Sequence, residues 1–275
     1  MTGNELRRRM RPTTRQRAGG EKQVICPTAH GAGRRLKAGM HASLLPFRAS
    51  LPRALRYALL ASLVAGLPRA AVAQERPSAF VDAAGVVPGL IVDMRYAGSH
   101  NFVGRPIDGY EAPRCLLTQS AAAALASVAR DLAPRGVVLK VFDCYRPTRA
   151  VANFVRWARD PDDVAGKAEF YPEVDKRTLF RDGYIAARSS HSRGSTVDLT
   201  LARSDGRELD MGTPFDFFSP RSWVAAGVSD EAKANRTLLA ATMRRRGFRP
   251  YAREWWHFTL AREPYPDSYF DFPVR

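Results

Sequence analysis

Two histidines and two carboxylates lie in two short polar segments of this sequence. His191 is followed seven residues later by Asp198, and Glu254 precedes His257 by three residues. Two imidazoles and one carboxylate form the ligand set of an open catalytic zinc site, which leaves a fourth position for water. Glu254 is then free to act as a base on that water. The pattern predicts a hydrolytic centre with one zinc ion per chain, held by His191, Asp198 and His257.

The same residues also have a purely structural interpretation. His191 could cap a loop, His257 could be a buried core histidine, and Asp198 could be a structural carboxylate. The sequence lacks the His-Glu-x-x-His helix motif of many zinc peptidases. The spacing by itself therefore leaves both interpretations open.

A third polar segment follows a β-rich run of the chain. Asp143 and Arg146 come directly after residues 137–142. An arginine at a strand end can stabilise the oxyanion that forms when a carbonyl group is attacked. Asp143 can orient that arginine through a charge-assisted hydrogen bond. Taken in isolation, however, the segment favours an ordinary surface ion pair before a helix.

Helices are predicted on both sides of these segments. Thr118 is the expected N-cap of a helix that ends near Ala133, where Pro134 and Gly136 follow. A second helix is expected to begin at Thr148. A third is expected after Ser229 and is closed by Gly247.

Strands are predicted where β-branched and apolar residues gather, at 89–97, 137–142, 195–201 and 253–260. Residues 160–190 have no clear period, which predicts a long covering loop. Helices and strands do not alternate strictly along the chain. We therefore expect an α+β fold in a single domain, with a mainly antiparallel sheet, flanking helices and the zinc site on the sheet.

The formal net charge of +16 is concentrated at the start of the chain. Residues 1–73 hold 14 of the 43 basic residues but only 2 of the 27 acidic ones, which leaves 29 basic and 25 acidic residues in 74–275. The second part has no basic stripe with interleaved aromatic residues. Nucleic-acid binding is therefore not expected.

An export signal is predicted near the start of the chain. Two arginines precede the apolar run 57–67, and an Ala-Val-Ala cleavage motif ends at Ala73. The run is too short to span a membrane. We expect an N-terminal extension and signal peptide over 1–73 and the functional domain over 74–275. The mature protein would be periplasmic or otherwise exported, without stable membrane insertion.

A disulfide is predicted from the two cysteines that remain after this cleavage. Cys115 precedes the first predicted helix, and Cys144 follows the strand after it. A helix and a strand that pack antiparallel return the chain to its starting edge, so the two thiols can meet. An even pair in an oxidising compartment favours a bridge. Two separate buried thiols are the alternative.

Taken together, the polar segments resemble the D-alanyl-D-alanine dipeptidase family, the zinc dipeptidases found among vancomycin-resistance enzymes and in bacterial dipeptide utilisation. The resemblance rests on SSHSRGSTVDLTL, EWWHF, DCYRP, NFVGRPIDGYE and EPYPDSYFDFPVR, and extends from about Gly89 to Arg275. It implies that the zinc ligands are His191, Asp198 and His257. It also implies that Glu254 is the catalytic base and that Arg146 stabilises the transition state.

The resemblance also implies residues that bind the substrate. The segment MGTPFDFF is similar to the family stretch whose aspartate binds the free ammonium group, which assigns Asp216 that role. Ser189 matches a family serine near the substrate, and Tyr96 and Tyr110 match tyrosines that line the pocket. Cys144 stands where the family usually has glycine. The export signal is a second departure, because the resistance enzymes act in the cytoplasm.

The activity implied by the resemblance is hydrolysis of the small dipeptide D-alanyl-D-alanine to two D-alanines. Asp216 would require a free amino terminus on the substrate. One alternative is a D,D-carboxypeptidase that trims peptidoglycan stem peptides, which the export signal favours. Another is a non-catalytic, zinc-stabilised module that binds the cell wall, which Glu254 and Arg146 argue against.

Overall fold

The computed structural model describes residues 74–275. The predicted signal peptide and its cleavage site after Ala73 lie outside the described residues, and the proposed boundary at 73/74 stays a prediction. Within the described part, no helix is both long and apolar enough to cross a bilayer.

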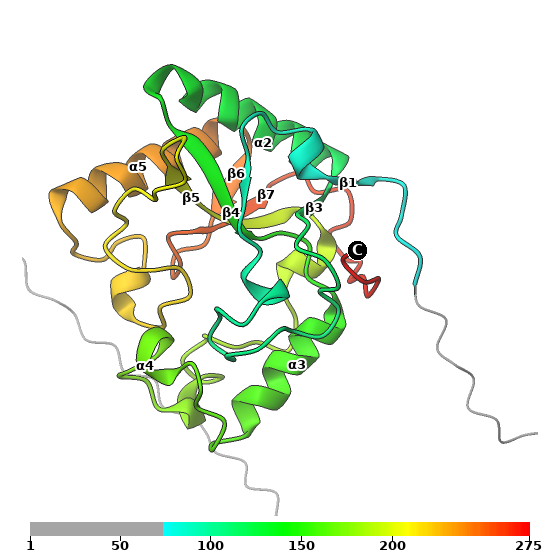
Figure 1. The fold of residues 1–275 in the computed structure, drawn as a ribbon, viewed down its shortest axis with the longest axis vertical. Helices are drawn as coiled ribbons and strands as arrows, with labels where there is room; N and C mark the ends of the chain where they lie inside the picture. Colours follow the sequence, from blue (N-terminus) through cyan, green and yellow to red (C-terminus); the bar gives the residue numbers. More distant parts are fainter. Residues whose placement is uncertain (1–73) are drawn as a thin grey trace, which may run out of the picture. The chain divides into compact units, whose positions relative to one another are not determined.

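A five-stranded sheet forms the centre of the fold (Figure 1). Its strands, in spatial order, are β2 (Ile91–Val92), β4 (Val138–Asp143), β5 (Thr196–Ala202), β7 (His257–Leu260) and β6 (Phe248–Pro250). The β2–β4 pair is parallel and the other three pairs are antiparallel. A separate antiparallel pair joins β1 (Phe80–Asp82) to β3 (Leu116–Thr118). The predicted α+β fold with a mainly antiparallel sheet is confirmed.

Four α-helices accompany the sheet: α2 (Gln119–Leu132), α3 (Thr148–Arg159), α4 (Lys167–Phe170) and α5 (Asp230–Arg245). Helices α2 and α5 contact each other and lie against β4, β5 and β6. In Figure 1, α3 and α4 lie at the opposite end of the domain from α2. Helices α2 and α5 therefore lie against the sheet, and α3, α4 and the loops around them form the other end of the domain.

Two of the three predicted helix starts have the expected side-chain caps, and α3 begins at Thr148 as predicted but without one. The Thr118 hydroxyl accepts a hydrogen bond from the Ala121 amide at 3.4 Å, and the Ser229 hydroxyl accepts one from Ala232 at 3.1 Å. Each cap satisfies one of the amides that a helix start leaves without an intrahelical partner. The third helix gives way to a turn at Gly247, whose φ is +86°.

Two predicted strands are much shorter in the structure. In the segment 89–97, only Ile91 and Val92 pair with the sheet, and a 3₁₀ turn at Arg95–Ala97 then buries the Tyr96 ring. In 253–260, the strand begins only at His257. The predicted 160–190 loop contains the short helix α4. Packing of the aromatic side chains, which local propensity does not describe, decides these boundaries.

The predicted bridge between Cys115 and Cys144 is present, with the Cα atoms 5.2 Å apart. Cys115 directly precedes β3, and Cys144 directly follows β4. Both cysteines are fully buried. The bridge therefore fixes the end of β4, where Arg146 and the chain leading to α3 emerge.

Candidate metal centre and substrate pocket

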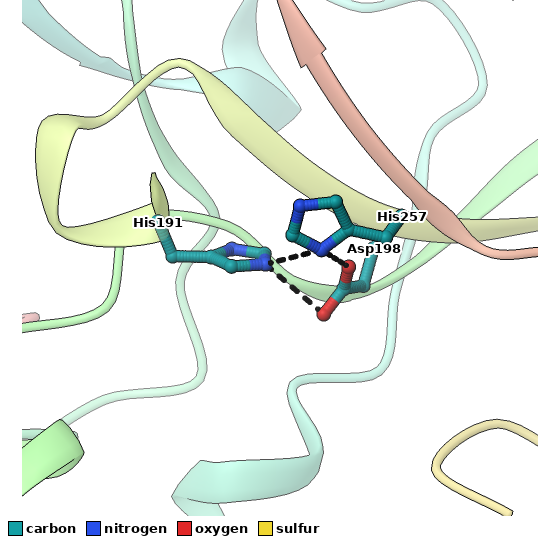
Figure 2. A group of neighbouring side chains, drawn as sticks. All are labelled: His191, Asp198 and His257. Carbon is teal, nitrogen blue, oxygen red and sulfur yellow. Dashed lines mark hydrogen bonds and ion pairs between the residues drawn. The ribbon is translucent and has the colours of Figure 1, made fainter. Parts of the chain in front are cut away.

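Three side chains from two adjacent strands and the turn before them meet at one point (Figure 2). Asp198 lies in β5, and His257 is the first residue of β7. The antiparallel register places these two residues directly opposite each other. His191 comes from the 3₁₀ turn Ser190–Arg193 just before β5.

The turn that carries His191 depends on Gly194. Its φ is +78°, a conformation that residues with a Cβ atom rarely adopt. A Cβ at this position would also lie 2.1 Å from the Phe80 ring. Glycine thus permits the sharp return from the turn into β5 and brings His191 back over Asp198.

The facing atoms of the three side chains are close enough to share one ion. The Asp198 carboxylate lies 3.0 Å from Nδ1 of His257 and 3.2 Å from Nε2 of His191. The two imidazole nitrogens are 3.3 Å apart. Possible ligand atoms of all three residues lie within 4.8 Å of one another. The sequence prediction that these residues form one cluster is confirmed.

The outer nitrogen of each imidazole has a hydrogen-bond partner. Nδ1 of His191 lies 2.7 Å from the Cys144 carbonyl oxygen, and Nε2 of His257 lies 3.2 Å from the Ser190 hydroxyl. A carbonyl oxygen can only accept, so Nδ1 of His191 donates to it, and Nε2 is the nitrogen that faces Asp198 and His257. Such outer partners orient histidine ligands in metal sites.

The Asp198 carboxylate supports the same interpretation. Its buried Oδ1 lies 3.0 Å from Nδ1 of His257 but has no well-aligned hydrogen-bond donor among the described residues. Burial raises the pKa of Asp198. The neighbouring His191 and His257 together lower it by more than burial raises it, so that the net pKa lies well below its usual range. A buried, ionised carboxylate beside two imidazole nitrogens fits a bound cation.

Glu254 lies at the edge of this cluster. It belongs to the turn before β7, where its amide donates to the Tyr251 carbonyl oxygen. Its carboxylate lies 3.5 Å from Nδ1 of His257. Burial raises the pKa of Glu254, and the neighbouring His257 partly opposes this shift. A carboxylate with a raised pKa is a stronger base than an exposed one.

Arg146 reaches the cluster from the end of β4. Its Nε and one terminal nitrogen lie 2.8 and 2.7 Å from Asp143 Oδ2, and the same terminal nitrogen lies 3.6 Å from Asp198. Burial lowers the pKa of Arg146, but Asp143 and the other acidic groups around it together raise it well above its usual value, so the guanidinium remains charged. Tyr110 donates to the other oxygen of Asp143 at 2.5 Å.

Tyr110 is therefore behind the site and not in it. The structure does not bring Tyr110 into the pocket wall, because its hydroxyl is turned towards the buried Asp143 and its ring is covered by the core. The family resemblance identified a residue that contacts a site residue, Asp143, but the direction of the Tyr110 side chain depends on tertiary packing. Tyr110 reaches the pocket indirectly, through its hydrogen bond to Asp143 and through its ring, whose centre lies 5.8 Å from that of the Tyr96 ring.

Asp216 lies on the loop that follows β5, and it is buried. Its φ of +59° is unusual for a residue other than glycine. The Tyr96 hydroxyl donates to its carboxylate at 2.8 Å. Burial and the nearby Asp198 charge raise the pKa of Asp216 well above its usual value. Strained backbone and a costly buried carboxylate are typical of functional positions.

The Asp216 loop is held at both of its ends by Arg236 of α5. This buried guanidinium donates to the carbonyl oxygens of Met211 at 2.7 Å, Trp223 at 2.9 Å and Arg221 at 3.0 Å. Arg236 could not be identified from the sequence, because nothing in its helical context distinguishes it from a surface arginine. It fixes the loop without touching the pocket.

The predicted site residues other than Tyr110 surround one cavity of about 280 Å³. Ser189 and Tyr96 lie in its wall, as predicted. Several further wall residues were not predicted from the sequence: Tyr184, Ile185, Arg188, Ser190, Phe218 and Tyr251. Most of these belong to segments without periodicity, but Ser190 could have been found from its position beside His191. His100 lies outside the wall and pairs with Glu169 at 2.6 Å.

An antiparallel sheet that presents two imidazoles and a carboxylate, with a second carboxylate and an arginine alongside, defines a metallohydrolase type of centre. A family model described as D-ala-D-ala dipeptidase matches residues 76–275. The chain belongs to this peptidase family.

Individual relatives agree with this assignment. The D-alanyl-D-alanine dipeptidase of Streptomyces coelicolor is 46% identical over 198 residues, which cover 71% of this chain and 97% of the relative. The protein of the same name from Enterococcus faecium is 45% identical over 192 residues, covering 69% and 95%. The one from Escherichia coli is 36% identical over 181 residues, covering 66% and 83%.

Proposed function

We propose that this protein is a zinc-dependent dipeptidase that hydrolyses D-alanyl-D-alanine to two D-alanines. The observation that carries the proposal is the convergence of His191, Asp198 and His257 within 4.8 Å, in a pocket that also holds Glu254 and Asp216. The relatives described above are named for the same activity.

The donor set fits zinc. Two imidazole nitrogens and a carboxylate match a catalytic zinc site with an open position, and both histidines are held from behind. A zinc ion bound here supplies Lewis acidity, which polarises a carbonyl group and lowers the pKa of a water molecule.

The protein's own groups carry the proton and the developing charge. Glu254 accepts a proton from the attacking water and delivers it to the amide nitrogen as the C–N bond breaks. Arg146 donates hydrogen bonds to the carbonyl oxygen as that atom becomes negative. Asp143 holds the guanidinium in place at 2.7–2.8 Å, so the donor is already oriented before the substrate arrives.

Asp216 supplies selectivity for a free amino terminus. Its buried carboxylate needs a positive partner, and the ammonium group of a dipeptide provides one. A blocked or extended amino end would leave the charge unpaired in the pocket, at a cost of several kcal/mol. A buried Asp216 therefore favours a dipeptidase over a carboxypeptidase that acts on stem peptides.

We also propose that the protein is exported, with cleavage after Ala73. The buried Cys115–Cys144 bridge supports this location, because structural disulfides persist in oxidising compartments. Sequencing the N-terminus of the protein recovered from the periplasm tests the proposal. We expect Gln74 as the first residue, and an intact N-terminus in the cytoplasm would contradict it.

The activity is tested by offering three substrates to the purified, zinc-loaded protein: D-alanyl-D-alanine, its N-acetyl derivative and a stem pentapeptide. Released D-alanine is measured for each. We expect good hydrolysis of the free dipeptide, poor hydrolysis of the acetylated one and almost none of the pentapeptide. Efficient cleavage of the pentapeptide would favour the carboxypeptidase, and no turnover of any substrate would favour a non-catalytic module.

A further inference from the structure

The proposed substrate carries a charge at each end, and only its ammonium group has been given a partner. A carboxylate that enters the pocket loses water and needs a cation or several hydrogen-bond donors in return. The inference below rests on the proposed function, because it identifies the group that meets the second end of the same dipeptide.

Two arginines line the pocket, and they differ in their partners. Arg146 is held by Asp143 and lies 3.6 Å from Asp198. Arg188 has no carboxylate partner in the part of the chain that the structure describes. The nearby Arg193, by contrast, pairs with Glu263 at 2.8 Å. Arg188 is thus the cation of the pocket wall that remains available to an anionic ligand.

The position of Arg188 in the chain suits this role. It directly precedes Ser189 and lies three residues before the metal-ligand candidate His191. Its guanidinium carbon lies 5.4 Å from the centre of the Tyr269 ring. A guanidinium that stacks on an aromatic ring is steadied without using its hydrogen-bond donors. These donors remain free for a carboxylate.

A second hollow of about 350 Å³ lies next to the pocket, and Val151, Arg188 and Ser189 line both. The wall of this hollow includes the buried Ser192, whose hydroxyl has no hydrogen-bond partner among the described residues. Asp267 also lines it, but no ion pair joins Asp267 to Arg188 there. Arg188 therefore lies where the two cavities adjoin, and the Ser192 hydroxyl is a second donor without a partner in the wall of one of them.

We propose that Arg188 binds the C-terminal carboxylate of the dipeptide. Asp216 would then bind the ammonium group of the substrate, and Arg188 would bind its carboxylate. This arrangement selects substrates of dipeptide length, because a longer C-terminal part would place its carboxylate beyond Arg188. Arg188 is a specificity residue and takes no part in proton transfer.

The test compares D-alanyl-D-alanine with D-alanyl-D-alaninamide, which lacks the negative charge. We expect the wild type to prefer the acid. Arg188→Met should lower kcat/KM for the acid about 10- to 100-fold, the range for loss of a charged hydrogen bond, and leave the amide unchanged. Arg188→Lys should restore most of the preference. Arg249→Met, at an exposed arginine of β6 outside the pocket wall, is the matched control.

Two results would overturn the inference: an equal loss for acid and amide in Arg188→Met, or no loss for either. If the wild type hydrolyses neither compound, the proposed activity fails. Calorimetric binding of the same two compounds then tests Arg188 separately. Tighter binding of the acid than of the amide, lost in Arg188→Met, would still support the carboxylate site, and equal binding would reject it.

Discussion

Asp198 and His257 lie directly opposite each other in the antiparallel pair β5–β7, and the Asp198 carboxylate is 3.0 Å from Nδ1 of His257. The same register sets Asp143 opposite Asp198 on the next strand. A single row of facing residues across three strands therefore links the carboxylate that holds Arg146 to two of the three metal-ligand candidates.

Removal of one ligand of this row should abolish metal binding. We expect the wild type to contain one zinc per chain and His257→Ala to contain almost none, because two remaining ligands hold the ion too weakly. Elemental analysis after dialysis measures this. His100→Ala is the control, since His100 is exposed and pairs with Glu169. Equal zinc in wild type and His257→Ala would remove His257 from the site.

Glu254→Gln should separate binding from chemistry. The substitution keeps the shape of the side chain but removes its ability to accept a proton. Zinc content should be unchanged, and kcat should fall about 10²- to 10⁴-fold, the range for loss of a general base. Glu173→Gln, at an exposed position outside the pocket wall, should behave as the wild type. Near-normal activity in Glu254→Gln would show that another group is the base.

Arg146→Ala should lower kcat by about 10²–10³-fold with a smaller change in KM, which is the effect expected when one oxyanion donor is lost. Tyr110→Phe should cause a smaller loss, because it removes only one hydrogen bond to Asp143. Steady-state kinetics on D-alanyl-D-alanine measures both. A change confined to KM in Arg146→Ala would mean that this arginine binds the substrate and does not stabilise the transition state.

Asp216 should make activity and stability respond to pH in opposite directions. Burial raises its pKa in the folded protein, so the carboxyl gains a proton as pH falls and can no longer bind an ammonium group. We expect kcat/KM to fall on the acidic side for this reason. Asp216→Asn should raise KM for D-alanyl-D-alanine and remove this part of the pH dependence.

Protonation of Asp216 should have the opposite effect on the stability of the folded protein, which it increases. A carboxyl whose pKa is raised by folding stabilises the protein below its unfolded pKa, and this contribution is lost as pH rises through the folded pKa. Asp216→Asn should therefore melt above the wild type near neutral pH, and the difference should shrink towards acid. Each 1 kcal/mol corresponds to about 2–4 °C in Tm for a domain of this size. A lower Tm at every pH would contradict the argument.

The disulfide should support both the fold and the metal site. Its cysteines are 29 residues apart, and closing such a loop stabilises by about 3–4 kcal/mol in the chain-entropy model. The Cys144 carbonyl oxygen also accepts the hydrogen bond from His191 at 2.7 Å. The double variant Cys115→Ser/Cys144→Ser should lower Tm and weaken zinc binding. Reductant should affect the wild type similarly and leave the double variant unchanged.

Local signals in the sequence were sufficient for several elements. Thr118 and Ser229 cap their helices as predicted, because a cap depends on residues within one turn of the chain. The cysteine pairing also followed from chain order, since a helix and a returning strand bring Cys115 back to Cys144. Strands of two or three residues, such as β1 and β6, are too short to show a period and were missed.

The chemistry of the site was predicted from residue types and from the family resemblance, but the direction of each side chain was not. Tyr96 and Tyr110 resemble each other as sequence signals, yet one faces Asp216 in the pocket and the other faces Asp143 behind it. The buried Arg236 looks like any helical arginine until its three carbonyl acceptors are seen. Residue identity and short spacing determine what a segment can do. Strand register and burial, which depend on contacts far apart in the chain, decide which atoms meet.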